Sequence, residues 1–465
     1  MELDLQKIKN VHFIGIGGIG ISAIARMMLH DGKNVTGQDM QEGEIVNELR
    51  KIGADINIGQ SYENIPEDTD LIIYTIAIDT YDAELAKKIK SNPILYKDSN
   101  GGGKEIPAFS YPQMLDIVSR DKYTIAVSGT HGKTTTTAMI AQILIDSGED
   151  TMVIVGSLIK NKDGSRTNFI AGESKPTRHH GSLGAGGYLV VEACEYRRSF
   201  LNINPKILVI TNIDNDHLDY YKDIEDIKSA FHTMALKVPA DGFVVCNTND
   251  PHINDVVKGI NAKVINWGEF YSEKLKLKVP GIHNKKDAAT ALAVADILGV
   301  DKQEAEKYVG EFPGTWKRFE FKGKLPNGVF VYDDYAHHPT EIMATLEGFR
   351  ELYSKDEGWH VTVVFQPHLF SRTKLLLNDF AKSFSNADQV MILPIYYARE
   401  VDDGTISSDI LAFEINKHTD NAEAFSSFDV LEKNLFVRLE KMGEKDIVVS
   451  MGAGEAVKII DRILL

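Results

Sequence analysis

The residues with the clearest chemical potential form a short loop, Gly129-Thr130-His131-Gly132-Lys133-Thr134, directly after an apolar run. Its glycines let backbone N–H groups surround phosphate oxygens, its lysine can reach the β- and γ-phosphates, and its threonine hydroxyl can bind Mg²⁺. Only two residues separate the glycines, whereas the Walker pattern has four. Thr135 continues a run of threonines that disfavours a helix start, so a function for the first two is the simpler interpretation. The loop predicts an ATP site, and the alternative is an accidental turn.

A second glycine loop near the N-terminus has the GxGxxG spacing, after one apolar strand and before a helix. An aspartate ends the next predicted strand, about 20 residues further on, as in dinucleotide-binding folds. Backbone N–H groups of such a loop can hold a diphosphate at the helix N-terminus. The ligand is NAD-like or nucleotide-sugar-like, and the structural alternative is a tight strand-to-helix turn. The residues of this predicted site are Gly15, Gly17, Gly18, Ile19, Gly20 and Asp39.

Two further side chains suggest a metal beside the phosphate loop. Glu192 lies at the end of the predicted strand YLVVEA, and His217 lies just past the strand KILVITNI. Since parallel strands end at one edge of a sheet, both can converge with Thr134 on a cation. Oxygen ligands with one imidazole suit Mg²⁺ or Mn²⁺ better than Zn²⁺. Taken singly, such a glutamate is more often a cap and such a histidine more often structural.

Polar residues also follow two strands in the last third of the chain. The segment that contains Asp333, Tyr335 and His338 ends one strand, and the segment from His368 to Arg372 ends another. Adjacent histidines point in different directions, which makes a zinc site a poor interpretation. Histidine and arginine at strand ends fit the binding of carboxylates or phosphates better. Arg318 precedes this region and can reach a bound nucleotide.

Composition limits the class of protein. The chain has 465 residues, a net charge of −16 and two cysteines, Cys194 and Cys246. Its length suggests several domains, and so few thiols fit a reducing cytoplasm. The negative charge disfavours nucleic acid as a partner, and no apolar run is long enough to predict a membrane span.

Strands and helices alternate throughout, which predicts α/β folding with parallel sheets. We expect three domains: 1–119 with the GxGxxG loop, 120–312 with the phosphate loop, and 313–465. The segment at 99–105, SNGGGKE, is a glycine cluster that indicates a flexible tip.

Taken together, the chain resembles the Mur ligase family. The motifs that carry the resemblance stand in family order along essentially the whole chain: GIGGIG, GTHGKTTTT, EACEYRRSF, TNIDNDHLDYY, PGIHN, FPGTWKRFE, DDYAHHPTEI and FQPHLFSRT. The shortened phosphate loop is the form that this family uses. GIGGIG is similar to the branch that adds the first amino acid and to the related branch that recycles a tripeptide.

The resemblance implies an N-terminal Rossmann-like domain for UDP-N-acetylmuramate, a central P-loop domain for ATP and Mg²⁺, and a C-terminal Rossmann-like domain for L-alanine. It implies an ATP-dependent carboxylate–amine ligase of peptidoglycan precursor synthesis, working through an acyl phosphate, as a cytoplasmic monomer or homodimer. By resemblance, Lys133, Glu192, His217 and Arg372 are catalytic. ATP would also contact Asn284, Asp287, Arg318 and Asp333, and the amino acid would contact Tyr335, His338, His368 and Arg372.

Several positions depart from the family pattern. Arg197 and Arg198 replace acidic or small residues, Asp287 replaces an asparagine near the adenine, and Leu369 replaces an arginine near the amino acid. The alternatives are a tripeptide ligase of murein recycling, an NAD-dependent dehydrogenase that uses GIGGIG, and a nucleotide-binding regulatory protein without catalysis. The dehydrogenase hypothesis leaves the phosphate loop unexplained, and no metal ligand expected of a catalyst is missing.

Overall fold

A computed structural model describes residues 3–91, 94–97, 103–160, 165–173, 187–218, 220–397 and 400–465. They form two compact units: Met1–Tyr271 with Asp287–Val309, and Ser272–Lys286 with Gly310–Leu465. Three larger sheets account for most of the described strands, and each lies within one of the three segments predicted from sequence. The boundaries expected between those segments, after residues 119 and 312, stay a prediction. Residues 98–102, which include most of the predicted glycine tip, lie outside the described residues.

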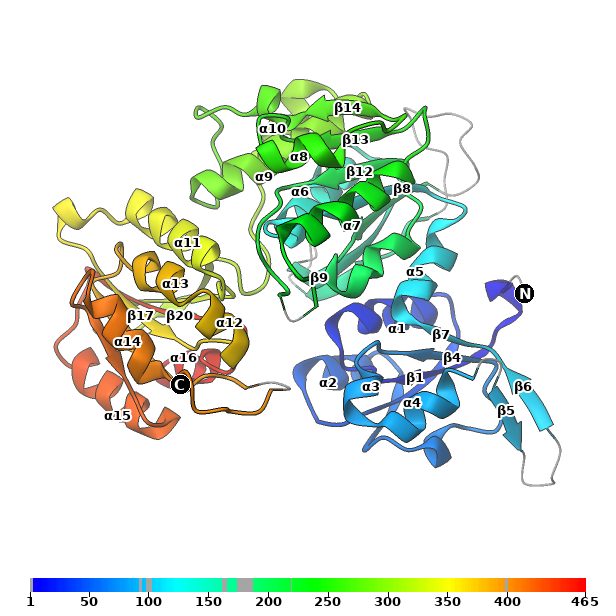
Figure 1. The fold of residues 1–465 in the computed structure, drawn as a ribbon, viewed down its shortest axis with the longest axis horizontal. Coiled ribbons are helices and arrows are strands. Elements are labelled where there is room, and N and C mark those ends of the chain that lie inside the picture. Colours follow the sequence, from blue (N-terminus) through cyan, green and yellow to red (C-terminus); the bar gives the residue numbers. More distant parts are fainter. Residues whose placement is uncertain are drawn as a thin grey trace. The chain divides into compact units, whose positions relative to one another are not determined.

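The first sheet is parallel, with strand order β3-β2-β1-β4-β7 (Figure 1). A separate antiparallel pair, β5 and β6, accompanies it. The strands are β1 (Asn10–Ile14), β2 (Asn34–Asp39), β3 (Asp55–Ile58), β4 (Leu71–Tyr74), β5 (Ile94–Lys97), β6 (Gly103–Ile106) and β7 (Ala108–Ser110). The helices are η1 (Leu5–Lys7), α1 (Ile19–His30), α2 (Glu44–Lys51), η2 (Tyr62–Asn64), α3 (Ile78–Tyr81), α4 (Ala83–Ile89) and α5 (Tyr111–Ser119).

The second sheet has the order β10-β9-β11-β8-β12-β13-β14, parallel except for the β9–β10 hairpin. Its central strands are buried along their length, as expected for apolar strands covered on both faces. The strands are β8 (Tyr123–Ser128), β9 (Thr151–Lys160), β10 (Arg166–Ile170), β11 (Tyr188–Glu192), β12 (Ile207–Ile210), β13 (Phe243–Cys246) and β14 (Lys263–Asn266). The helices are α6 (Lys133–Asp146), η3 (Tyr196–Asn202), α7 (Ile224–Leu236), α8 (Pro251–Val256), η4 (Trp267–Phe270), α9 (Ile282–Ile297) and α10 (Lys302–Gly310).

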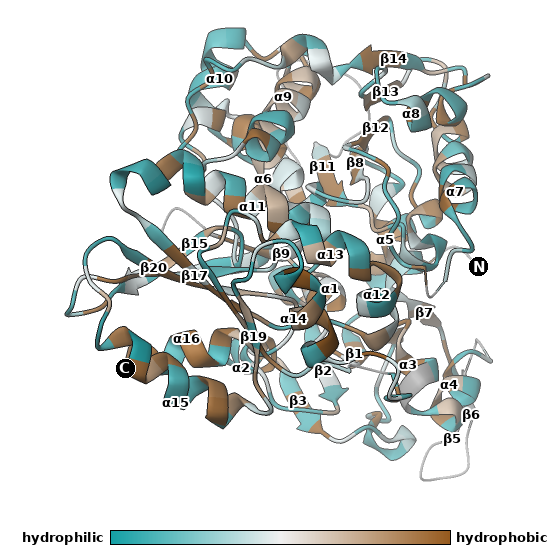
Figure 2. Ribbon diagram, turned by 60° about the vertical axis from the view of Figure 1, so that its left-hand side comes forward, coloured by the Kyte–Doolittle hydropathy of each residue, from teal (hydrophilic) through white to brown (hydrophobic). Residues whose placement is uncertain are grey.

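The third sheet forms the core of the second unit, with the order β15-β16-β20-β17-β18-β19 and only β15 antiparallel. Figure 2 shows hydrophobic inner strands such as β17, while α15 alternates hydrophobic and hydrophilic residues because one side faces the core. The strands are β15 (Glu320–Lys324), β16 (Phe330–Asp334), β17 (His360–Phe365), β18 (Gln389–Ile392), β19 (Ala422–Ala424) and β20 (Asp446–Met451). The helices are α11 (Pro339–Leu352), η5 (Lys355–Glu357), α12 (Phe370–Leu375), α13 (Leu377–Ser383), α14 (Ser408–Asn416), α15 (Phe428–Leu439) and α16 (Val457–Ile463).

Two local features of the second unit bear on the site. The segment after β17 forms two short helices, α12 and α13, which are separated at Leu376. The segment Ser272–Lys286 belongs with the third sheet because Gly281 N–H donates to Glu351 Oε2 over 2.8 Å and Lys285 pairs with the same carboxylate. Among the described helices, none is both long and apolar enough to cross a bilayer.

Candidate active site

The phosphate loop connects β8 to α6, and its geometry requires both glycines. Gly129 and Gly132 have φ angles of 132° and 78°, which favour glycine. A Cβ atom at Gly129 would lie 2.0 Å from Thr211 Oγ1, and one at Gly132 would lie 2.4 Å from Asp287 Oδ1. The helix α6 begins without a side-chain cap, so its first backbone N–H groups face the loop.

The residues after β12 fix the loop in place. His131 N–H donates to Asn212 Oδ1 over 2.9 Å, and Asn212 Nδ2 donates to the His131 carbonyl over 3.0 Å. Asp214 N–H donates to Thr130 Oγ1 over 2.9 Å, and His131 Nε2 lies 3.2 Å from Asp214 Oδ2. Thr130 and His131 therefore contribute rigidity to the loop.

Lys133 is held by three acceptors. Its ammonium group donates to the carbonyl oxygens of Gly129 and Thr130 over 2.6 and 2.9 Å and lies 3.0 Å from Glu195 Oε2. Burial alone would lower the pKa of Lys133, but the charges of Glu195, Cys194 and Glu192 outweigh it and raise that pKa above its ordinary value. The lysine is therefore a permanent cation beside the loop.

Glu195 is a site residue that sequence reasoning missed. Its side chain is almost fully buried, only 3% exposed, and its backbone carbonyl accepts from the Tyr221 hydroxyl. The available signal was its position three residues after Glu192, just past the end of the strand that carries this predicted metal ligand. Such a buried carboxylate needs a cation, and Lys133 supplies it.

Thr134 and Glu192 lie together as predicted. Thr134 Oγ1 is 3.0 Å from Glu192 Oε2 and 3.1 Å from Oε1, and Gly156 N–H donates to the same carboxylate over 2.8 Å. Two neighbouring ligands of an octahedral Mg²⁺ with bonds of about 2.0–2.1 Å stand about 2.9 Å apart. The pair therefore fits the edge of a Mg²⁺ coordination sphere. Thr135 is buried at the start of α6.

His217 lies closer to Glu195 than sequence suggested. Its Nε2 is 3.7 Å from Glu195 Oε1 and 3.9 Å from Asp216 Oδ2, and its ring lies 4.7 Å from the Tyr196 ring, tilted by 39°. The residue has a φ of 55°, a strained conformation that tends to occur at functional sites. In the part of the chain that the structure describes, Glu192, Glu195 and His217 do not gather their donor atoms tightly around one point.

The first glycine loop joins β1 to α1, a helix that also begins without a side-chain cap at Gly18. Gly17 N–H donates to Asp39 Oδ2 over 2.8 Å, so this aspartate of the predicted site contacts the loop itself. A Cβ atom at Gly20 would lie 2.9 Å from the Tyr111 ring, which makes this glycine a close-packing position. Ile19, the first residue of α1, follows the N-cap glycine. The loop therefore presents the start of α1 to an anion.

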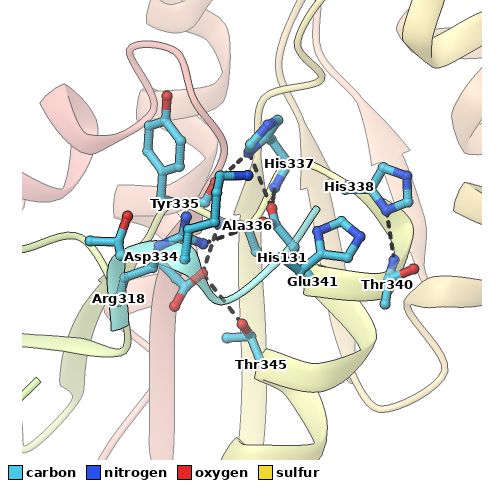
Figure 3. A network of polar contacts seen from close by, with 12 residues as sticks. His131, Arg318, Asp334, Tyr335, Ala336, His337, His338, Thr340, Glu341 and Thr345 are labelled. Carbon is cyan, nitrogen blue, oxygen red and sulfur yellow. Dashed lines mark hydrogen bonds and ion pairs between the residues drawn. The ribbon is translucent and has the colours of Figure 1, made fainter. Parts of the chain in front are cut away.

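The second unit brings several predicted residues together around β16 and α11 (Figure 3). The Arg318 guanidinium lies 5.2 Å from the centre of the Tyr335 ring and 3.5 Å from Glu341 Oε1. His337 Nδ1 lies 2.9 Å from the Tyr335 carbonyl, whereas His338 caps α11 by accepting from Thr340 N–H over 3.3 Å. The two histidines thus have different partners, as their adjacency suggested.

Two aspartates at the end of β16 face opposite sides of the sheet. Asp334 accepts from Phe319 N–H and Ala336 N–H, both over 2.7 Å, and burial raises its pKa. Asp333 accepts from the Ser450 hydroxyl, and burial raises its pKa to about 6. Asp333 is only 3% exposed, so its carboxylate is buried against one face of the sheet.

The segment after β17 places two more predicted residues side by side. Arg372 Nη1 lies 3.3 Å from His368 Nδ1, and the His368 ring stacks on Tyr396 with 5.6 Å between centres. Leu369 is 4% exposed and has a φ of 72° at the start of α12. Because Leu369 is buried and apolar, it adds no cation beside Arg372.

The helix α9 carries the two residues that the resemblance placed near adenine. Asn284 Nδ2 donates to the Pro280 carbonyl over 2.6 Å. Asp287 Oδ1 accepts from the Thr136 hydroxyl over 3.1 Å, and the same carboxylate packs against Gly132. The contact that Asp287 makes is therefore with the phosphate loop and α6. Its predicted contact with adenine remains a prediction.

Comparison with known proteins identifies the chain. Residues 10–123 match the Mur ligase family catalytic domain, residues 127–293 the Mur ligase middle domain, and residues 317–454 the Mur ligase glutamate ligase domain. The chain belongs to the Mur ligase family. The three-domain α/β fold inferred from sequence is thereby confirmed, and so is the resemblance. Members of this family use ATP.

Two curated Mur ligases illustrate the likeness. The UDP-N-acetylmuramate–L-alanine ligase of Caldanaerobacter subterraneus subsp. tengcongensis is 38% identical over 100% of this chain and 99% of its own. The enzyme of the same name from Caldicellulosiruptor saccharolyticus is 39% identical over 97% of both chains. A crystal structure of UDP-N-acetylmuramate-alanine ligase from Thermotoga maritima superimposes with a TM-score of 0.74, 28% identity and 98% coverage of both chains. A murein peptide ligase from Psychrobacter arcticus shares the fold, with a TM-score of 0.68 and 22% identity over 98% of both chains.

Proposed function

We propose that this Mur ligase joins L-alanine to the lactyl carboxylate of UDP-N-acetylmuramate while ATP is converted to ADP and phosphate, in the synthesis of peptidoglycan precursors. The single observation that carries the proposal is the arrangement of Lys133, Thr134, Glu192 and Glu195 around a shortened phosphate loop. Full-length relatives named for this reaction support the choice of substrates over the tripeptide of the recycling reaction.

The chemistry begins with a poor electrophile. A carboxylate resists attack by an amine, and transfer of the γ-phosphoryl group to it creates a leaving group. Lys133 would exchange its carbonyl partners Gly129 and Thr130 for phosphate oxygens and keep its charge during transfer, since its pKa is raised. The amine of alanine would then attack the acyl phosphate, and the tetrahedral intermediate would expel phosphate.

Thr134 and Glu192 would hold Mg²⁺, with Mn²⁺ as a substitute, because their spacing fits one edge of its coordination sphere. The ion would supply positive charge against the developing charge of the phosphoryl group. His217, whose Nε2 lies beside the Glu195 carboxylate, would be a further ligand of the ion. Glu195 would keep Lys133 in the loop before ATP binds.

In the second unit, Arg372 would bind the amino-acid carboxylate, and Tyr335, His338 and His368 would bound a small pocket. Arg318 would reach the nucleotide, together with Asn284, Asp287 and Asp333 from the predicted ATP site. The first loop, with Gly15, Gly17 and Asp39, would bind the diphosphate and ribose of the UDP-sugar. We place the reaction in the cytoplasm, with the protein as a monomer or homodimer.

Release of ADP tests the proposal. ADP and phosphate should form only when ATP, Mg²⁺, UDP-N-acetylmuramate and an amino acid are all present, and L-alanine should give the highest kcat/KM in a panel with glycine, L-serine and the recycled tripeptide. Equal ADP release without the UDP-sugar would refute it, and a preference for the tripeptide would favour the recycling reaction.

A further inference from the structure

Tyr111 belongs to neither glycine loop and has no role in the sites described above. It is the first residue of α5, which a capping box between Ser110 and Gln113 fixes at its start. The ring lies against Gly20: the position of a Cβ there is 2.9 Å from its Cζ and 3.1 Å from its hydroxyl oxygen. The phenol therefore stands beside the first turn of α1, where the diphosphate is proposed to bind.

The helix that carries Tyr111 also reaches the segment that follows β11. The helix α5 packs against α1 on one side and against η3, which begins directly after Glu195, on another. Burial raises the pKa of the Tyr111 phenol above its usual range, and the charges of Glu192 and Cys194 raise it further. The hydroxyl is thus a neutral proton donor within the electrostatic field of the Glu192 site.

The Tyr111 hydroxyl makes no hydrogen bond with any residue that the structure describes. Its side chain is partly buried against the core of the first unit. Because the residue is only partly buried, this hydroxyl is open to a ligand as a hydrogen-bond donor. An anionic oxygen would satisfy it best, because charge-assisted hydrogen bonds are the strong ones.

We propose that Tyr111 binds the lactyl carboxylate of the UDP-sugar and positions it between the glycine loop and the phosphate-transfer site. This inference rests on the proposed function. That function requires a carboxylate tethered to the diphosphate at α1 to reach the γ-phosphate beside Lys133 and Glu192. Tyr111 contacts the first region directly, and its helix packs against η3, which begins directly after Glu195. Its O–H donates to the carboxylate oxygen that does not attack phosphorus, and the same oxygen later carries the charge of the tetrahedral intermediate.

Tyr111→Phe isolates the hydroxyl, because the ring that packs on Gly20 remains. Calorimetric titrations compare UDP-N-acetylmuramate with UDP-N-acetylglucosamine, the same nucleotide sugar without the lactyl group. We expect the variant to bind the first about tenfold or more weakly and the second within about twofold of the parent, since a hydrogen bond to a charged group is at stake. Turnover should fall by about 10–10²-fold with the KM for ATP unchanged.

Tyr123→Phe is the matched control, because Tyr123 begins β8 at the end opposite the phosphate loop and packs on Tyr188. It should leave both affinities unchanged. Equal weakening of both nucleotide sugars in Tyr111→Phe would assign the hydroxyl to the diphosphate and overturn the inference, as would no change in either. Failure of the proposed function is distinguishable, because the parent protein would then not turn over UDP-N-acetylmuramate at all.

Discussion

The two glycine loops of the first unit share a backbone plan and differ in charge. Each follows a parallel strand and leads into a helix without a side-chain cap, so both present backbone N–H groups to an anion. At the first loop, the carboxylate of Asp39 accepts from Gly17 N–H. At the second, the ammonium group of Lys133 bonds the loop carbonyls and Glu195. The first loop therefore offers an anion only backbone donors, whereas the second also offers the permanent positive charge of Lys133.

The sharpest test of this difference is Lys133→Ala, which should lower turnover by about 10²-fold or more, the scale of one transition-state charge partner. The KM for the UDP-sugar should hardly change. The variant also leaves Glu195 buried without a cation, at a cost of about 3–5 kcal/mol in the free energy of unfolding. Thermal melting and steady-state kinetics measure the two effects.

The double variant Lys133→Ala/Glu195→Gln separates the loss of turnover from the loss of stability. Removal of the Glu195 charge should restore much of the melting temperature while turnover stays low. If turnover recovers with stability, Lys133 has a structural role and the charge distinction between the loops fails.

Gly17→Val tests the first loop. Its Cβ would lie 2.9 Å from Val46 Cγ2 and 3.0 Å from Asp39 Oδ2, so the loop must shift away from the diphosphate. We expect the KM for UDP-N-acetylmuramate to rise roughly 10–100-fold, the value of one hydrogen bond to a charged group, with the KM for ATP nearly unchanged. Gly43→Val is the control, because nothing lies within 4 Å of that position. NAD(H) binding in competition with the UDP-sugar would instead favour a dehydrogenase-like site.

Arg372→Lys provides a comparison outside both loops. Lysine keeps the charge but cannot form two parallel hydrogen bonds to a carboxylate, so the KM for the amino acid should rise by about tenfold. Both nucleotide KM values should stay within about twofold. A larger effect on ATP than on alanine would move Arg372 to the phosphate site.

Asp333→Asn should have the smallest kinetic effect and a pH-dependent effect on stability. Burial raises the pKa of Asp333 from 3.8 to about 6, so the folded protein binds more protons than the unfolded chain between these values. Parent stability is therefore lost through this group as pH rises from about 4 to 6, by about 3 kcal/mol at most. The melting temperature of the variant relative to the parent should increase across that range. A raised KM for ATP in the variant would support the nucleotide contact predicted from sequence.

Sequence patterns predicted most of the inner strands because apolar runs between glycine loops are unambiguous in parallel sheets. They predicted the Thr134–Glu192 contact because the ends of adjacent parallel strands share an edge. They missed β10, since an antiparallel edge strand has no such run.

Other contacts between residues that lie far apart in the chain could not be predicted from the sequence. Nothing in the order of residues places Glu195 on Lys133 or Asp287 beside Gly132, because each pair joins segments far apart in the chain. The resemblance supplied residue types at motif positions, and where this chain departs from the family, as at Asp287, only the fold reveals the partner.

Each of the two units is built from two separate segments of the chain, and this constrains the order in which they can fold during synthesis. The first unit needs Asp287–Val309, most of which lies in α9 and α10, yet Ser272–Lys286 joins the second unit and leaves the ribosome earlier. The N-terminal unit therefore cannot be completed during synthesis until the opening segment of the other unit has emerged. A fragment cut at 313 would also lose Gly281, whose N–H donates to Glu351, so a separately expressed C-terminal fragment should begin near Ser272.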